Sequence, residues 1–403
     1  MASSHMGSRA RGVEQTVRAA FDRRHGLGYR YECHIGSGAQ GDIFRLMRRD
    51  RHGEGLLRFI VKIIADELTG VPGRFMDEKD VMTVSSLRQD MMNQWSILME
   101  YRILRGAEHI VQRITPSGPD PLRRILGPSL PDNQWMYMEY VENGTLQTFL
   151  NKVASRGGRL PNRIMWKIYM CFVRIGIAFA WPDVHTPGPV VVETIHPDTP
   201  PRMLLNTDLH AENMMFGKMD DNLEHSLVPI MKNIDLGCVQ EVPTPDEATW
   251  DRATKSFVAG VGLELMILQQ MEKVAELGRG NIHHPGIDPD LRNAILLSRS
   301  SNQSEVPDLL GLAGGVSRAV YERDANWYYQ NMPDHEPQHE KDDAIELIIR
   351  VCLLDAPAAP EVSTDSGRRS RSRSRRSSRS VARPGSPPRR SWSEVRAQLL
   401  PYM

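Results

Sequence analysis

The sequence has few cysteines and no long apolar run. Its four cysteines, Cys33, Cys171, Cys238 and Cys352, lie far apart and form no CxxC pair. A dense disulfide framework is therefore excluded, and a reduced intracellular compartment, cytoplasmic or nuclear, is expected. No segment approaches the ~18 consecutive apolar residues of a membrane-spanning helix, so no membrane partner is expected. The opening MASSHMGSRARG has no apolar stretch of the kind found in signal peptides, which favours the same location.

The chain also lacks net charge, because 50 Lys or Arg residues balance 50 Asp or Glu residues. The two signs are segregated, however. Residues 367–403 hold 11 basic residues and one acidic residue, a net charge of +10, so the rest of the chain carries −10. This asymmetry predicts a basic arm on a mildly acidic body.

An Arg- and Ser-rich segment over residues 361–391 supplies most of that positive charge. Like charges repel and almost nothing apolar is present to pack, so a disordered insertion is predicted before residues 392–402, which again have helical apolar spacing. Arginine-rich segments contact RNA or acidic partners. Few aromatic residues interleave here, and a solvated spacer remains the alternative.

The first part of the chain has the patterns of a strand-rich unit. Apolar periodicity predicts a short lead-in helix over 13–28 and one main helix over 85–105. Alternation around a glycine-rich turn predicts a hairpin over 30–47, and β-branched or aromatic runs predict strands over 56–64 and 135–141.

The second part is mostly helical. Buried helices are predicted over 163–181, 257–271 and 344–354, and the proline-rich residues 182–203 are predicted to form a long loop. A strand-rich unit followed by a larger helical one is an α+β, two-lobed plan.

A glycine-rich turn, Gly36-Ser-Gly-Ala-Gln-Gly41, is the first motif with chemical meaning. The residues after it read as a strand and not as a helix, which argues against a dinucleotide-binding fold. A strand, a glycine turn and a second strand can instead form a flap whose backbone N–H groups cover phosphates. Lys62 follows within an apolar strand, where a lysine is costly unless it is paired, and Glu100 on the predicted helix is its candidate partner.

Three polar residues further along the chain have the spacing of phosphoryl transfer. Asp208 and Asn213 lie in a short polar loop between two apolar strands, where the Asp can act as a base and the Asn as a metal ligand. Asp235 follows another strand and precedes Gly237. A carboxylate there can bind Mg²⁺, which prefers a few protein oxygens together with phosphate oxygens.

Taken in order, these motifs resemble the eukaryotic protein kinase superfamily, and in particular divergent kinase-like proteins of filamentous fungi. The matching positions are the loop glycines Gly36, Gly38 and Gly41, the apolar Ile43, the Lys62 and Glu100 pair, the hinge-like Met138, Glu139 and Val141, and the polar Asp208, Asn213 and Asp235.

The resemblance implies a bilobal kinase fold with a strand-rich N-lobe over residues 30–140, a helical C-lobe over 141–403 and an N-terminal extension over 1–29. It implies ATP and Mg²⁺ as cofactors and a protein Ser/Thr hydroxyl as the acceptor. Lys62, held by Glu100, would contact phosphates, and Asp208 would accept the hydroxyl proton. The remaining matched residues would line the nucleotide site, with Asn213 and Asp235 as the magnesium ligands.

The sequence also departs from the family pattern. Asn206-Thr207 replaces the His-Arg that precedes the catalytic Asp, His210 replaces a lysine, and no Ala-Pro-Glu follows Asp235. A pseudokinase that binds nucleotide without transferring phosphate therefore stays open. So does a small-molecule kinase, because Asp-Leu-His-x-x-Asn also resembles aminoglycoside and choline phosphotransferases.

One further pattern matches a metal-binding motif by its letters only. His335-Glu-Pro-Gln-His339 fits the HExxH zinc-protease motif, but that motif needs a helix and Pro337 lies inside it. A solvated loop before the helix at 344 is expected instead.

Overall fold

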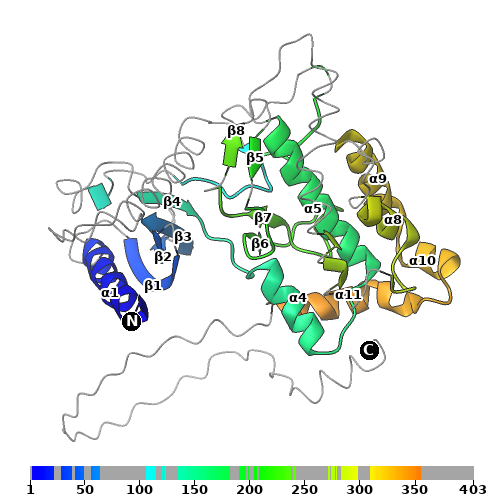
Figure 1. Ribbon diagram of the computed structural model, residues 1–403, viewed down its shortest axis with the longest axis horizontal. Helices are drawn as coiled ribbons and strands as arrows, with labels where there is room; N and C mark the ends of the chain where they lie inside the picture. Colours follow the sequence, from blue (N-terminus) through cyan, green and yellow to red (C-terminus); the bar gives the residue numbers. More distant parts are fainter. Residues whose placement is uncertain are drawn as a thin grey trace, which may run out of the picture.

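A computed structural model gives the fold as a mixed α+β arrangement. It describes residues 2–21, 29–38, 41–49, 56–63, 106–114, 120, 122–123, 135–181, 190–196, 198, 204–206, 208–236, 239–241, 271–272, 274–276, 278, 283–297 and 309–354. The predictions for Glu100, the helix over 85–105, most of the helix over 257–271 and the Arg/Ser segment 361–391 lie outside these residues. In Figure 1 a four-stranded sheet lies at one end of the molecule and most helices lie at the other.

The sheet is antiparallel and its strands follow chain order. It contains β1 (Tyr29–Gly38), β2 (Gly41–Arg49), β3 (Leu56–Ile63) and β4 (Trp135–Glu139). The predicted hairpin and the two predicted strands are confirmed. β2 alternates, with Phe44 and Leu46 buried, whereas every residue of β3 from Phe59 to Ile63 is buried. A central strand covered on both faces explains why β3 reads as a continuous apolar run.

The N-terminal helix α1 (Ala2–Ala20) packs on the sheet at β1 and β2. Val13, Val17 and Ala20 form its buried stripe at helical spacing. The ring of Phe21 then meets Tyr29 edge to face, with centroids 5.9 Å apart. The predicted lead-in helix was placed too late, because α1 begins at Ala2 and ends at Ala20.

Residues 106–114 connect the sheet to the helical part. On one side, Ile114 N donates to Tyr137 O and Glu139 N donates to Gln112 O, both at 2.9 Å, which extends the sheet beyond β4. On the other side, Val111 N donates to the carbonyl of Asn233 at 2.9 Å. The segment therefore couples the sheet to the strands that carry the polar motifs.

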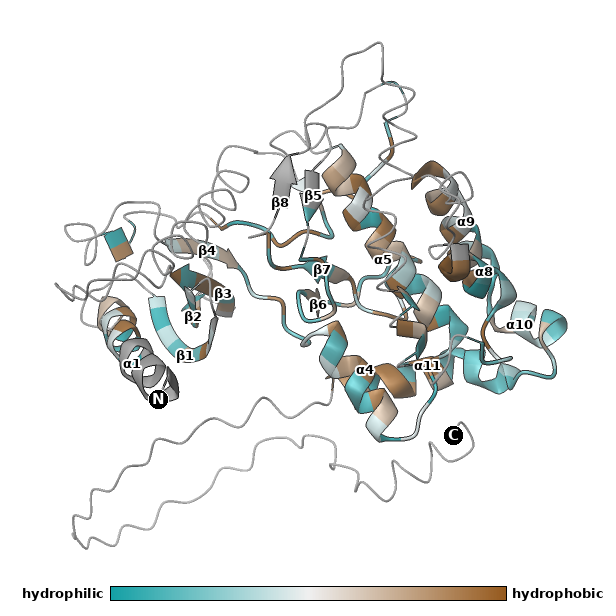
Figure 2. Ribbon diagram, in the orientation of Figure 1, coloured by the Kyte–Doolittle hydropathy of each residue, from teal (hydrophilic) through white to brown (hydrophobic). Residues whose placement is uncertain are grey.

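The helical part is built around α5 (Asn162–Ala180), which is buried along nearly its whole length. Around it lie α4 (Leu146–Ser155), α8 (Pro289–Leu297), α9 (Leu309–Glu322), α10 (Ala325–Asn331) and α11 (Asp342–Ile349), the last continued by the π-helical η7 (Arg350–Leu354). The predicted helices over 163–181 and 344–354 are confirmed. Figure 2 shows α5 with apolar residues on most of its surface, as expected of a central helix.

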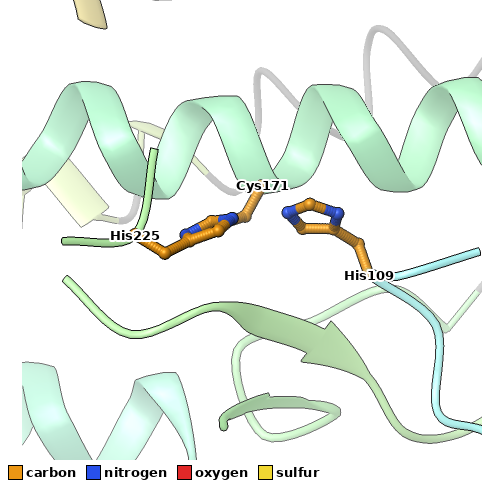
Figure 3. A group of neighbouring side chains, drawn as sticks. All are labelled: His109, Cys171 and His225. Atoms are coloured by element: carbon orange, nitrogen blue, oxygen red, sulfur yellow. The ribbon is translucent and has the colours of Figure 1, made fainter. Parts of the chain in front are cut away.

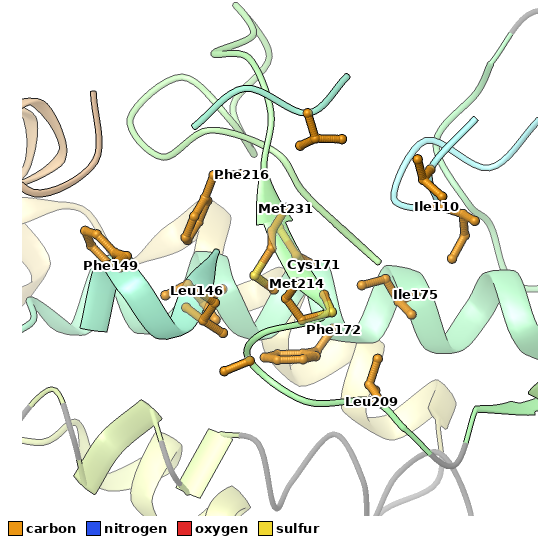
Figure 4. Close-up of a cluster of buried hydrophobic side chains, with 14 of the residues drawn as sticks. Ile110, Leu146, Phe149, Cys171, Phe172, Ile175, Leu209, Met214, Phe216 and Met231 are labelled. Atoms are coloured by element: carbon orange, nitrogen blue, oxygen red, sulfur yellow. The ribbon is translucent and has the colours of Figure 1, made fainter. Parts of the chain in front are cut away.

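The core beside α5 also supports two short strands, β6 (Met214–Phe216) and β7 (Met231–Asn233). Figure 4 shows Phe216 and Met231 from these strands among side chains of α4 and α5. The rings of Phe149 and Phe216 meet edge to face at 5.4 Å. Burial of each such side chain contributes about 1.5–3 kcal/mol, so the strands that flank the polar motifs are firmly anchored.

The HExxH segment is neither a zinc-protease helix nor the solvated loop that the sequence suggested. Pro337–Glu340 form a short 3-10 helix, η6, in which His339 and Glu340 are buried. The Glu340 carboxylate accepts hydrogen bonds from Asn162 N at 2.7 Å and Arg163 N at 3.0 Å. It satisfies the unpaired amides at the start of α5, which explains its burial.

None of the helices in the described part of the chain combines the length and the apolar character needed to traverse a bilayer.

Candidate active site

The glycine-rich hairpin lies at the end of β1 and β2. Gly36 faces Ile43 across the pair, and Gly38 faces Gly41 beside the turn. Gly41 has φ of 139°, a region that residues with a Cβ rarely adopt. By contrast, a Cβ added to Gly36 would meet no atom within 4 Å. The backbone conformation therefore requires a glycine at position 41, whereas nothing in the space around position 36 does.

This difference makes a testable prediction. Gly41→Ala is expected to lower the free energy of unfolding by about 1–3 kcal/mol, because alanine would be strained at that φ. Gly36→Ala is the matched control and should leave stability unchanged or slightly raised, since an extended Gly loses more backbone freedom than Ala on folding. Urea unfolding of both variants measures the difference. Equal stabilities would contradict the conformational role of Gly41.

Lys62 lies in the centre of the sheet. It pairs with Ile43 of β2 on one side and with Met136 of β4 on the other. The residue is only 6% exposed, and its Nζ lies 3.4 Å from Oδ1 and 3.5 Å from Oδ2 of Asp235. The predicted need for a partner is met by a carboxylate of the helical part. The predicted pairing with Glu100 lies outside the described residues.

Two pairs of short strands bring the polar motifs together. β5 (Leu204–Asn206) pairs with β8 (Val239–Glu241), and β6 pairs with β7, both antiparallel. The loop with Asp208 and Asn213 leaves β5 and enters β6, while Asp235 follows β7. Asp208 and Asp235, more than twenty positions apart in the sequence, are thus brought close to each other by these strand pairs.

Asn206 holds the two aspartates in place. Its Nδ2 donates to the backbone carbonyl of Asp235 at 2.9 Å, and its Oδ1 accepts from Asp208 N at 3.0 Å. Asn206 is fully buried. The sequence marked this residue only as a departure from the family's His, but the structure gives it a bridging role that needs both a donor and an acceptor.

Asn213 is oriented toward Asp208. Its Nδ2 donates to the carbonyl and to Oδ2 of Asp208, both at 3.0 Å, while its own backbone carbonyl accepts from Ile234 N at 3.0 Å. With Nδ2 used in this way, Oδ1 is the amide atom suited to a metal. The Asp208 side chain is 44% exposed, and His210 Nε2 lies 3.4 Å from its Oδ1.

The hinge-like residues lie on and after β4. Met138 and Val141 are buried, in agreement with an apolar pocket wall or core. The Glu139 carboxylate accepts from Gln112 N and from Lys232 Nζ, each at 2.7 Å. The Glu139 side chain therefore ties β4 to residues 106–114 and to β7.

Of the predicted site residues, the structure gathers Lys62, Asp208, Asn213 and Asp235. The glycine hairpin, Ile43 and the residues of β4 belong to the same sheet as Lys62. No protein-family model matches this chain, and a search of curated proteins returns no significant match. The functional argument therefore rests on the geometry.

Proposed function

We propose that this chain is an ATP- and Mg²⁺-dependent phosphotransferase with a bilobal, protein-kinase-like architecture, acting on Ser or Thr hydroxyls of proteins. The sheet with Lys62 would form the smaller lobe, and the helical part with Asp208 and Asp235 the larger one. Nucleotide would bind between them, below the glycine hairpin.

The contact of Lys62 with Asp235 carries this proposal. A buried lysine from the sheet meets a carboxylate that follows β7, and Asp208 and Asn213 lie on the adjoining loop. A cation for phosphate oxygens, a proton acceptor and two oxygen ligands are the groups that phosphoryl transfer requires, because its catalysis is mostly positioning and charge stabilisation.

The donor set fits a magnesium ion. The Asp235 carboxylate and the Asn213 amide oxygen are hard oxygen ligands, and there are only two of them. Such a set suits an ion that keeps its remaining positions for water and phosphate oxygens. When bound, Mg²⁺ would neutralise the negative charge of the phosphates. Lys62 would orient the same phosphates, and Asp208, through its exposed carboxylate, would orient the acceptor hydroxyl and take its proton.

A second candidate is a small-molecule kinase. The observation that favours it is the position of His210, whose Nε2 lies 3.4 Å from the Asp208 carboxylate, where the protein-kinase pattern has a lysine. A third candidate is a pseudokinase, which would bind the nucleotide without transferring phosphate.

A transfer assay with γ-labelled ATP separates these candidates. We expect Mg²⁺-dependent label on a generic protein acceptor and none when the metal is chelated. Label on an aminoglycoside or choline instead would favour the second candidate. Thermal stabilisation by Mg-ATP without transfer to any acceptor would indicate a pseudokinase, and the absence of both binding and transfer would refute the proposal.

A further inference from the structure

A second group of potential ligand atoms lies in the core of the helical part. His109 comes from residues 106–114, Cys171 from α5 and His225 from the connection between β6 and β7. One ligand atom from each residue lies within 4.8 Å of the other two. Figure 3 shows the two imidazole rings side by side below α5, with Cys171 descending from the helix toward them. The three residues are 0%, 1% and 1% exposed, respectively.

The ring of His109 is oriented by Glu193. One carboxylate oxygen accepts from the backbone N of His109, and the other lies 2.7 Å from its Nδ1. This contact leaves Nε2 as the ring nitrogen available to the cluster. A carboxylate on the far nitrogen of a ligating histidine is a common feature of metal sites, where it fixes the tautomer and raises the basicity of the ligand.

Three ring nitrogens of the two histidines lack hydrogen bonds. Nε2 of His109 and both ring nitrogens of His225 are buried without a hydrogen-bond partner among the described residues. Most buried polar atoms are paired, so three unpaired nitrogens on two adjacent rings need an explanation. A metal ion at the cluster would take one nitrogen from each ring. The two rings pack against each other with centroids 5.2 Å apart, and that contact satisfies no lone pair.

A buried ion pair explains only part of this arrangement. Burial disfavours the charged His109, but the Glu193 carboxylate and the neighbouring Cys171 outweigh it and raise the pKa of His109 to about 10. Burial lowers the pKa of His225 to about 3, and the nearby His109 acts in the same direction. A protonated His109 explains why the Glu193 carboxylate lies against its ring. It does not explain His225, whose two ring nitrogens remain unpaired.

We propose that His109, Cys171 and His225 form a buried binding site for a zinc ion, with Glu193 as the carboxylate that orients His109. Imidazole nitrogen and cysteine sulfur are the donors that zinc prefers. In a tetrahedral site with bonds of about 2.0–2.3 Å, neighbouring ligand atoms lie about 3.3–3.8 Å apart. The atoms of the cluster lie within 4.8 Å of one another, so they need to approach by at most about 1.5 Å. Water would complete the fourth position.

The charges and protons balance. When zinc binds, the Cys171 thiol loses its proton and His109 loses the proton on Nε2, both to solvent. The ion and the thiolate then carry a net charge of +1, which Glu193 neutralises. Zinc affinity should therefore rise with pH.

The position of the site suggests what the ion stabilises. It would join α5 to residues 106–114, which extend the sheet, and to the connection before β7. The carbonyl of His109 accepts from Asn233 N at 2.9 Å, and Asn233 Oδ1 accepts from Asp235 N at 3.1 Å. The ion would lie two hydrogen bonds from Asp235.

The experiment measures metal in the full-length protein. After purification without chelator, elemental mass spectrometry should find close to one zinc ion per chain. Removal with a strong chelator should lower the Tm, and zinc but not magnesium should restore it. Cobalt in place of zinc should give the thiolate-to-metal charge-transfer absorption in the near ultraviolet, which reports the Cys171 ligand directly.

Variants separate the site from adventitious metal. Cys171→Ser and His225→Gln should lose the zinc, whereas the matched controls Cys352→Ser and His339→Gln, also at buried positions, should keep it. Glu193→Gln should keep zinc with about 10–100-fold weaker affinity. Parent protein without zinc, and without a zinc-dependent Tm or cobalt spectrum, would overturn the proposal even if the variants fail to fold. Copper in place of zinc would overturn the assignment of the ion.

Discussion

Asp208→Asn is expected to reduce phosphoryl transfer by about 10²–10⁴-fold while Mg-ATP continues to raise the Tm, because the change removes the proton acceptor and little of the phosphate contact. The fold should tolerate it. An asparagine oxygen can still accept from Asn213 Nδ2, and the backbone N of residue 208 still donates to Asn206. The measurement pairs radiolabel transfer with thermal shift.

Two further variants test whether the loss of transfer is specific to Asp208. Asp235→Asn should lose Mg²⁺-dependent binding and transfer together, since this carboxylate contacts Lys62 and is the proposed metal ligand. Asp221→Asn is the matched control, because Asp221 is exposed in the same part of the chain and should change neither quantity. If Asp208→Asn transfers phosphate as well as the parent, Asp208 is not the base and the interpretation of residues 204–216 has to change.

Asp288→Ala is expected to be the most destabilising single substitution in the helical part. Asp288 is fully buried. Its Oδ2 accepts from Trp166 Nε1 at 3.0 Å, from Tyr328 OH at 2.9 Å and from Arg323 Nη1 at 2.5 Å. Removing it leaves the buried donors of Trp166 and Tyr328 unpaired and takes from Arg323 its buried partner, so that only the exposed Asp290 still pairs with it. Breaking a buried pair typically costs about 3–5 kcal/mol.

Asp290 provides the control for this prediction. Asp290 forms an ion pair with the same Arg323, but its side chain is 65% exposed. Water can replace that contact, so Asp290→Ala should change the free energy of unfolding by no more than about 1 kcal/mol. Urea unfolding curves of both variants give the comparison, and Asp288→Asn, which keeps the shape, serves if the alanine variant does not fold. A similar small cost for both positions would contradict the buried network.

Local patterns along the chain were enough to predict several of the individual elements. The alternation around Gly36 to Gly41, the apolar run that contains Lys62 and the periodicity of residues 163–181 each reflect a local preference, and β1, β2, β3 and α5 follow them. Such preferences depend on near neighbours in sequence, so they can be read without the fold. The same holds for Asp208 and Asn213, whose short polar loop between two strands is confirmed.

Predictions failed where a residue's environment comes from distant parts of the chain. Glu340 was expected in a solvated loop, yet it is buried because the start of α5 needs acceptors for its amides. Asn206 was seen as a departure from a motif, yet it joins Asp208 to Asp235. Neither role leaves a trace in the neighbouring residues.

The sequence by itself therefore determined the α+β composition, the positions of β1 to β4, α5 and α11, and the order of the polar motifs, but it did not predict α4, α8, α9 or α10. Only the tertiary structure decided that Lys62 meets Asp235 and that His109, Cys171 and His225 surround one point. The physical reason is that these contacts join residues far apart in the chain. Their side chains meet only after the sheet, residues 106–114 and α5 have packed together, and no local pattern encodes that packing.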